Sequence, residues 1–139
     1  MVGSFYVQSN HVSFLSALMG IPLGFLTTSI LINHDQIFFD AYQKAGKRSF
    51  TVTVGRKSAM ATSFILTLFS YSIIIAGIAG KILPATTALV LLTLPLFVVQ
   101  VRLYQTPAQS PLHYVKLTQS TFALSVLFGL LLALGLMLG

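Results

Sequence analysis

The sequence predicts an all-α, polytopic membrane protein with about four transmembrane helices. Of its 139 residues, 55% are hydrophobic and only 7% are charged. A soluble domain carries about a quarter charged residues, so this chain has too few polar side chains to cover a surface that faces water. Four long segments carry no charged residue at all, namely residues 1–34, 58–80, 82–101 and 117–139.

Each charge-free segment is long enough for a helix to cross a hydrocarbon layer of about 30 Å. A backbone in lipid must satisfy its own hydrogen bonds, and a helix does this within one segment. We therefore expect one membrane domain spanning residues 1–139, with helices at about 14–33, 58–80, 82–101 and 117–139. Pro22 and Pro95 fall inside the first and third of these helices, where each is expected to cause a kink.

The basic residues predict the orientation of the chain in its membrane. Two predicted loops, residues 34–57 and 102–116, share one side if four helices alternate, whereas Lys81 lies on the other side. Seven of the eight basic residues belong to these two loops: Lys44, Lys47, Arg48, Arg56, Lys57, Arg102 and Lys116. Cytoplasmic loops carry an excess of Lys and Arg, so both loops are expected to be cytoplasmic, in a cell inner or thylakoid-type membrane.

Membrane topology alone requires basic residues in cytoplasmic loops. It therefore explains several of these residues as well as a role in binding or catalysis would. Arg56, Lys57, Arg102 and Lys116 therefore keep two equally weighted interpretations.

One segment, residues 33–57, combines those basic residues with the only two acids of the chain, Asp35 and Asp40. Topology does not require acids. Mg²⁺ binds proteins through one or two carboxylates and keeps positions open for substrate phosphates. Lys44, Lys47 and Arg48 would supply donors to the phosphate oxygens. The segment predicts a metal–diphosphate site at the membrane surface, with both acids as metal ligands.

Two features of the acids leave other interpretations open. In the alternative interpretation, Asp35 and Asp40 only form surface ion pairs with the neighbouring basic residues, an arrangement that contributes little energy. Their spacing of five residues also places them about 140° apart around an ideal helix. They could share a metal only if the helix unwinds between them, or else each binds its own ion.

The run from Asn33 to Gly55, which contains Gly46-Lys-Arg-Ser49, resembles the second aspartate-rich motif of the UbiA superfamily of intramembrane prenyltransferases. Residues 3–8 and 20–24 are similar to the stretch before that motif in its 1,4-dihydroxy-2-naphthoate branch. The resemblance implies Mg²⁺-dependent transfer of a polyprenyl group from its diphosphate to an aromatic acceptor, in menaquinone or phylloquinone synthesis. By this resemblance Asp35 and Asp40 hold the metal, and the diphosphate is bound by Asn33, Lys44, Lys47 and Arg48.

The sequence departs from the family pattern in two ways. Counted back from Gly46, the acids of the family would fall at Phe38 and Tyr42. The first aspartate-rich motif is absent from the printed sequence. We therefore expect the chain to correspond to the C-terminal half of a prenyltransferase, truncated or split, with a separately encoded N-terminal half and membrane lipid as partners. No nucleic-acid partner is expected.

Three other function classes are alternatives to prenyl transfer. The first is a non-catalytic membrane protein that binds a prenyl lipid or a partner subunit. The second is a small transporter, but such proteins place an ionisable residue at mid-membrane, and the predicted helices have none. The third is haem or metal binding by His11, His34 and His113, whose spacing is unlike that of ligands.

Overall fold

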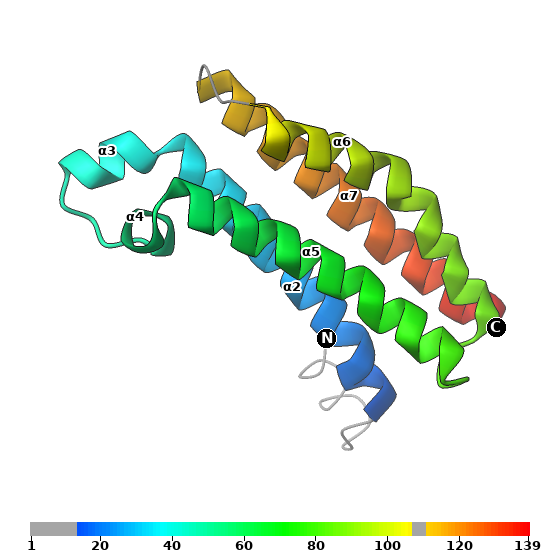
Figure 1. Cartoon of the computed structure of the whole chain (residues 1–139). Helices are drawn as coiled ribbons and strands as arrows, with labels where there is room; N and C mark the ends of the chain where they lie inside the picture. The colour runs from blue at the N-terminus through cyan, green and yellow to red at the C-terminus, as the bar shows by residue number, and fades with distance from the viewer. Residues whose placement is uncertain (1–13, 107–110) are drawn as a thin grey trace.

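The structure is a computed structural model that describes residues 14–106 and 111–139, with the side chains from Leu18 onward (Figure 1). These residues form α-helices and one 3₁₀ helix, and no strand occurs among them. Three segments are long and apolar enough to cross a membrane: Arg56–Ala79, Ala85–Gln105 and Pro111–Leu138. The predicted all-α membrane class is confirmed.

The helices extend beyond the charge-free ranges from which they were predicted. Helix α2 is Phe14–Ile37 and α5 is Arg56–Ala79. The third predicted helix begins as the 3₁₀ helix η1, Ala85–Thr93, and continues as α6, Leu94–Gln105, while α7 is Pro111–Leu138. Helices α2, α6 and α7 thus continue a few residues past the approximate ends predicted at 33, 101 and 117, because a helix can carry charged residues in its terminal turns.

Helix α2 is the fourth long helix, and it packs along α5 and α7. Its crossing of the membrane stays a prediction, since the three apolar segments above do not include it. Pro22 lies inside α2 as expected. Pro95, in contrast, lies in the first turn of α6. Proline is tolerated there, because a backbone N–H at that position would have no partner within the α-helix. The predicted kink is therefore a change from 3₁₀ to α geometry.

The segment between α2 and α5 contains two short helices, α3 (Phe39–Lys44) and α4 (Phe50–Val54). The Ser49 side chain caps α4 by accepting a hydrogen bond of 3.3 Å from the Val52 N–H. Gly46 and Gly55 have φ values of 66° and 83°, a left-handed conformation that glycine adopts without strain. These two glycines let the chain turn between the short helices and into α5.

One end of the bundle, which we call the closed end, is held by close backbone contacts. A Cβ atom on Gly135 of α7 would lie 2.7 Å from the Thr86 carbonyl oxygen and from the Thr87 Cα. A Cβ atom on Gly77 of α5 would lie 2.5 Å from a methyl group of Leu83. Glycine therefore allows α5, η1 and α7 to meet closely here, beside the turn that contains Lys81.

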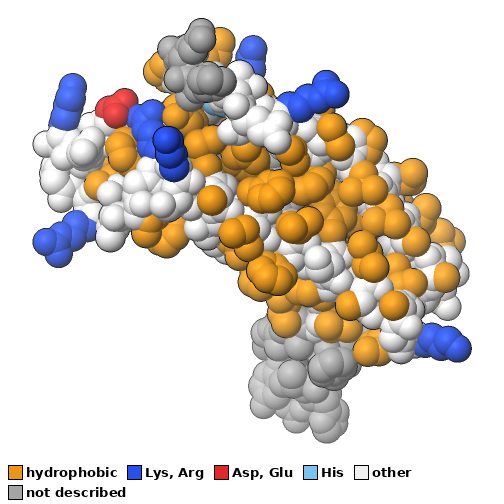
Figure 2. All heavy atoms as spheres, in the orientation of Figure 1, with side chains coloured by type: hydrophobic (Ala, Val, Ile, Leu, Met, Phe, Trp, Pro, Cys, Tyr) orange, Lys and Arg blue, Asp and Glu red, His pale blue; other side chains and the backbone are white. Residues whose placement is uncertain are grey.

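The opposite end, which we call the basic end, brings the two predicted basic loops together. An Arg56 N–H of α5 donates a hydrogen bond of 3.1 Å to the Tyr114 hydroxyl of α7, which joins residues 34–57 to residues 102–116. Figure 2 shows most of the visible Lys and Arg side chains gathered around this end. Residues of the two loops therefore meet at one end of the bundle, and the placement of both loops on the cytoplasmic side of a membrane stays a prediction.

Candidate functional site

A set of polar side chains, all buried except the half-buried Tyr104, joins all four long helical segments near the basic end. We call it the interior network, and it consists of Asn33, Ser63, Gln100, Tyr104 and Thr121. The Asn33 amide donates to the Tyr104 and Thr121 hydroxyls at 3.0 and 2.9 Å. The Gln100 amide donates to the same two hydroxyls at 3.1 and 3.0 Å, and Ser63 Oγ lies 2.7 Å from Tyr104 Oη.

The interior network has a direct bearing on the predicted role of Asn33. Its side chain is fully buried, with 0% of its surface exposed, and both amide hydrogens are directed at hydroxyls inside the bundle. The structure therefore does not bring Asn33 together with the exposed Lys47 and Arg48. Diphosphate binding by Asn33 stays a prediction that this geometry does not favour.

Asp35 lies near the end of α2, where its partly buried side chain borders a shallow apolar pocket of about 350 Å³. The other lining residues come from α2, α4 and α5: Thr28, Leu31, Ile32, Phe50, Thr62 and Leu66. Among the residues that the structure describes, Asp35 forms no ion pair. This carboxylate therefore lies at the boundary between an apolar pocket and the polar segment that follows α2.

Asp40 has a different environment on α3. Its side chain is 76% exposed, and its Oδ1 lies 2.9 Å from an Nη of Arg56, whose side chain is 30% exposed. Within the described ranges, no three metal-ligating side chains come together. Asp40 is paired with a guanidinium here and Asp35 borders a different pocket, so the structure does not show the two carboxylates arranged around one Mg²⁺ ion. Metal binding by either acid stays a prediction.

The three predicted phosphate-binding side chains, Lys44, Lys47 and Arg48, are all exposed, with Lys44 at the end of α3 and the other two in the segment that joins α3 to α4. Lys47 Nζ lies 3.9 Å from the centre of the Tyr42 ring, a cation–π contact. No carboxylate contacts these three residues in the part of the chain that the structure describes. Their donors are therefore available to an anionic ligand.

The structure also singles out Arg56, which sequence analysis explained equally well by topology. We call Arg56 and its neighbours Phe39, Asp40 and Tyr114 the Arg56 cluster. The guanidinium carbon lies 4.5 Å from the centre of the Phe39 ring and 5.0 Å from that of Tyr114. One signal in the sequence indicated the importance of Arg56, which is its position directly after Gly55, at the end of the motif.

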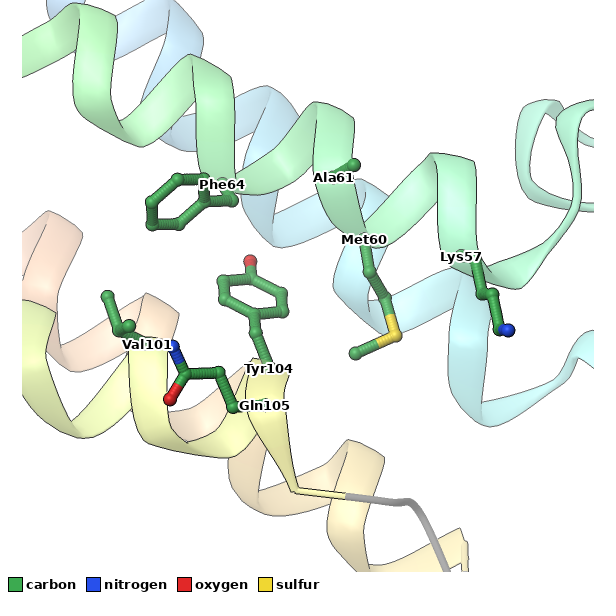
Figure 3. Close-up of a pocket in the computed structure, with 7 residues that line it drawn as sticks. All are labelled: Lys57, Met60, Ala61, Phe64, Val101, Tyr104 and Gln105. Carbon is green, nitrogen blue, oxygen red and sulfur yellow. The ribbon is translucent and has the colours of Figure 1, made fainter.

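Between α5 and α6 lies a groove with a volume of about 420 Å³ (Figure 3). We call it the α5–α6 groove, and it is lined by Lys57, Met60, Ala61, Phe64, Val101, Tyr104 and Gln105. Most of its surface is apolar, with Lys57 at the basic end. Tyr104 belongs both to this groove and to the interior network, so the network fixes one wall of the groove.

A sequence model of the UbiA prenyltransferase family matches residues 1–115. The chain belongs to this family. It is similar to the 1,4-dihydroxy-2-naphthoate octaprenyltransferase of Bacillus subtilis (strain 168), with 25% identity over 139 aligned residues, which cover 97% of this chain and 43% of that protein. The chain thus spans less than half the length of this UbiA relative. No solved structure matches the chain significantly.

Proposed function

We propose that this chain takes part in the transfer of a polyprenyl group from a prenyl diphosphate to an aromatic acceptor within a membrane. Membership of the UbiA family supports this reaction class. The name of the Bacillus subtilis relative favours 1,4-dihydroxy-2-naphthoate as the acceptor. Because the chain spans 43% of that relative, activity of this chain is itself part of the proposal.

The observation that carries the proposal is the position of residues 44–48, which we call the basic segment, at the end of apolar helices. Lys44, Lys47 and Arg48 lie exposed there, and no carboxylate among the described residues pairs with their donors. When the bond between the prenyl carbon and the diphosphate oxygen breaks, negative charge develops on the leaving diphosphate. Fixed cationic donors stabilise that charge and so lower the barrier to bond breaking. These three side chains are therefore the proposed diphosphate ligands.

The α5–α6 groove is the proposed site for the prenyl chain. Its walls are mainly apolar, and two aromatic rings, Phe64 and Tyr104, meet edge to face with centroids 6.1 Å apart. An apolar groove shelters an isoprenoid tail and keeps water away from the reacting carbon. Lys57 at the groove and the basic segment lie at the same end of the bundle, so tail and diphosphate would have adjacent sites.

A second function, binding of a prenyl lipid without catalysis, is favoured by one observation. Asp40 is paired with Arg56, and the described residues contain no group of three metal-ligating side chains. A protein with the groove and the basic segment but without a metal site would bind a prenyl diphosphate and leave it unchanged.

One experiment separates these functions. The chain is reconstituted in phosphatidylcholine nanodiscs and given farnesyl diphosphate and 1,4-dihydroxy-2-naphthoate, with and without Mg²⁺, and the prenylated product is measured by chromatography. Product formation that falls in the double variant Lys47→Gln/Arg48→Gln, but not in Lys81→Gln at the closed end, supports prenyl transfer. Binding without product supports the second function, and absence of both contradicts the two proposals together.

A further inference from the structure

We propose that Arg56 is a further diphosphate-binding residue of this site and that Asp40 is its exchangeable counter-ion. The inference rests on the proposed function. It adds Arg56 to the proposed diphosphate ligands, although membrane topology alone could account for a basic residue at this position. It is carried by the geometry of the Arg56 cluster, in which the guanidinium is held by several groups and only one of them is an acid.

Three contacts position the guanidinium independently of Asp40. One of its N–H groups donates to the Tyr114 hydroxyl at 3.1 Å, and the rings of Phe39 and Tyr114 lie within 5.0 Å of its central carbon. The backbone is fixed as well, because the Gln36 amide donates to the Arg56 carbonyl at 3.3 Å. Residues of α2, α3 and α7 therefore hold Arg56 at the start of α5.

The bond to Asp40, in contrast, is easily exchanged. The Asp40 side chain is 76% exposed, and an ion pair that is open to solvent contributes little to stability. A diphosphate carries more negative charge than one carboxylate, and its oxygens match the planar fork of a guanidinium. A diphosphate could therefore replace Asp40 while Tyr114 and the two rings keep Arg56 in place.

The sequence neighbours of Arg56 support the same assignment. Lys57, the next residue of α5, lines the α5–α6 groove. The preceding residues lead back through α4 to Lys47 and Arg48. In the sequence, Arg56 thus lies between the proposed diphosphate donors and Lys57 of the groove, which makes it a candidate to contact the headgroup of a bound prenyl diphosphate.

The two roles considered for Asp40 predict opposite effects of one substitution. If Asp40 is a competing counter-ion, Asp40→Asn frees the guanidinium and tightens diphosphate binding, by about twofold to fivefold for an exposed pair. If Asp40 is a metal ligand, the same substitution weakens binding in the presence of Mg²⁺. The sign of the change decides between them.

The test measures displacement of a fluorescent farnesyl diphosphate analogue by inorganic diphosphate. It uses the full chain in phosphatidylcholine nanodiscs, in buffer with EDTA and again with Mg²⁺. Arg56→Gln is expected to weaken diphosphate binding about tenfold or more, since a hydrogen bond to a charged group is lost. Arg56→Lys should restore part of the affinity, and Tyr114→Phe should weaken binding without removing the charge.

Arg102→Gln is the matched control, because Arg102 is an exposed arginine of α6 near the same end. An equal loss of affinity in Arg56→Gln and Arg102→Gln would mean that the effect comes from general surface charge, and it would overturn the inference.

The inference would also be overturned if Arg56→Gln bound diphosphate within twofold of wild type, provided that its circular dichroism and melting temperature match those of wild type. If Arg56→Gln proves unfolded, the comparison of Arg56→Lys with Arg102→Lys decides by the same criterion. Wild-type protein that binds no diphosphate would remove the proposed function along with this inference.

Discussion

The two ends of the bundle are built on different principles. At the closed end, glycines let the backbones of α7 and η1 approach until no methyl group fits between them. At the basic end, α5 and α6 leave a groove between them, and polar side chains rather than backbone contacts join the helices. The closed end therefore holds the helices together, whereas the basic end leaves room for a ligand.

Within the basic end, a second contrast separates interior from surface. The amides and hydroxyls of the interior network are bonded to one another, and all are buried except that of the half-buried Tyr104. The charged side chains of α3 and of the segment after it are exposed and weakly held. Stability and binding are thus carried by different residues, and substitutions should separate the two properties.

The largest loss of stability is expected from Gly135→Ala at the closed end. The new Cβ would lie 2.7 Å from backbone atoms of Thr86 and Thr87, which cannot rotate away as a side chain would. Overpacking of this kind costs about 1–3 kcal/mol of unfolding free energy, measurable by unfolding in mixed micelles of increasing SDS. Gly24→Ala is the control, because a Cβ at Gly24 has nothing within 4 Å. Equal stability of the two variants would contradict the close approach.

The next effect is expected from Asn33→Leu in the interior network. The substitution removes two hydrogen bonds that Asn33 donates to hydroxyls of α6 and α7, and one of 3.4 Å that it accepts from Tyr104. Side-chain hydrogen bonds between transmembrane helices contribute about 0.6 kcal/mol on average and about 1.7 kcal/mol at most, so a loss of about 1–2 kcal/mol is expected in the same micelle assay. Thr27→Val is the control, since that exposed hydroxyl bonds only within its own helix, to the Leu23 carbonyl. A variant as stable as the control would show that the network does not join the helices.

Filling the α5–α6 groove should affect ligand binding more than stability. Ala61 lines the groove, and Ala61→Phe would displace a few methylene groups of a prenyl tail. We expect farnesyl diphosphate to bind about tenfold more weakly, while inorganic diphosphate binds as before. Ala76→Phe, at an exposed position farther along α5, provides the control in a displacement assay. If both alanine variants behave alike, the tail does not lie in this groove.

The smallest effect is expected for the stability of Asp40→Asn. The lost ion pair is exposed, so the free energy of unfolding should change by no more than about 0.5 kcal/mol. Thermal unfolding of the purified variant measures this change. A loss above about 1 kcal/mol would mean that Asp40 stabilises the fold. It would contradict the conclusion that the charged side chains of α3 contribute little to stability.

The sequence predicted the helices and the gathering of charge at one end, because both follow from local composition. It placed the end of the first helix at about 33 and the start of the last at about 117, whereas α2 continues to Ile37 and α7 begins at Pro111, since a helix continues past the charge-free run into its polar flanks. It could not predict the interior network, whose partners Asn33 and Thr121 are 88 residues apart. Arg56 was ambiguous for a similar reason, because its Tyr114 partner belongs to a different helix.

The most direct test of the central claim compares farnesyl diphosphate with farnesol, which has the same tail and no diphosphate. Binding of each to the wild-type chain is measured by titration calorimetry in phosphatidylcholine nanodiscs, with protein-free nanodiscs as the blank. If the basic end binds diphosphate, farnesyl diphosphate should bind at least about a hundredfold more tightly, and excess inorganic diphosphate should displace it. Equal affinities for the two compounds would contradict the claim.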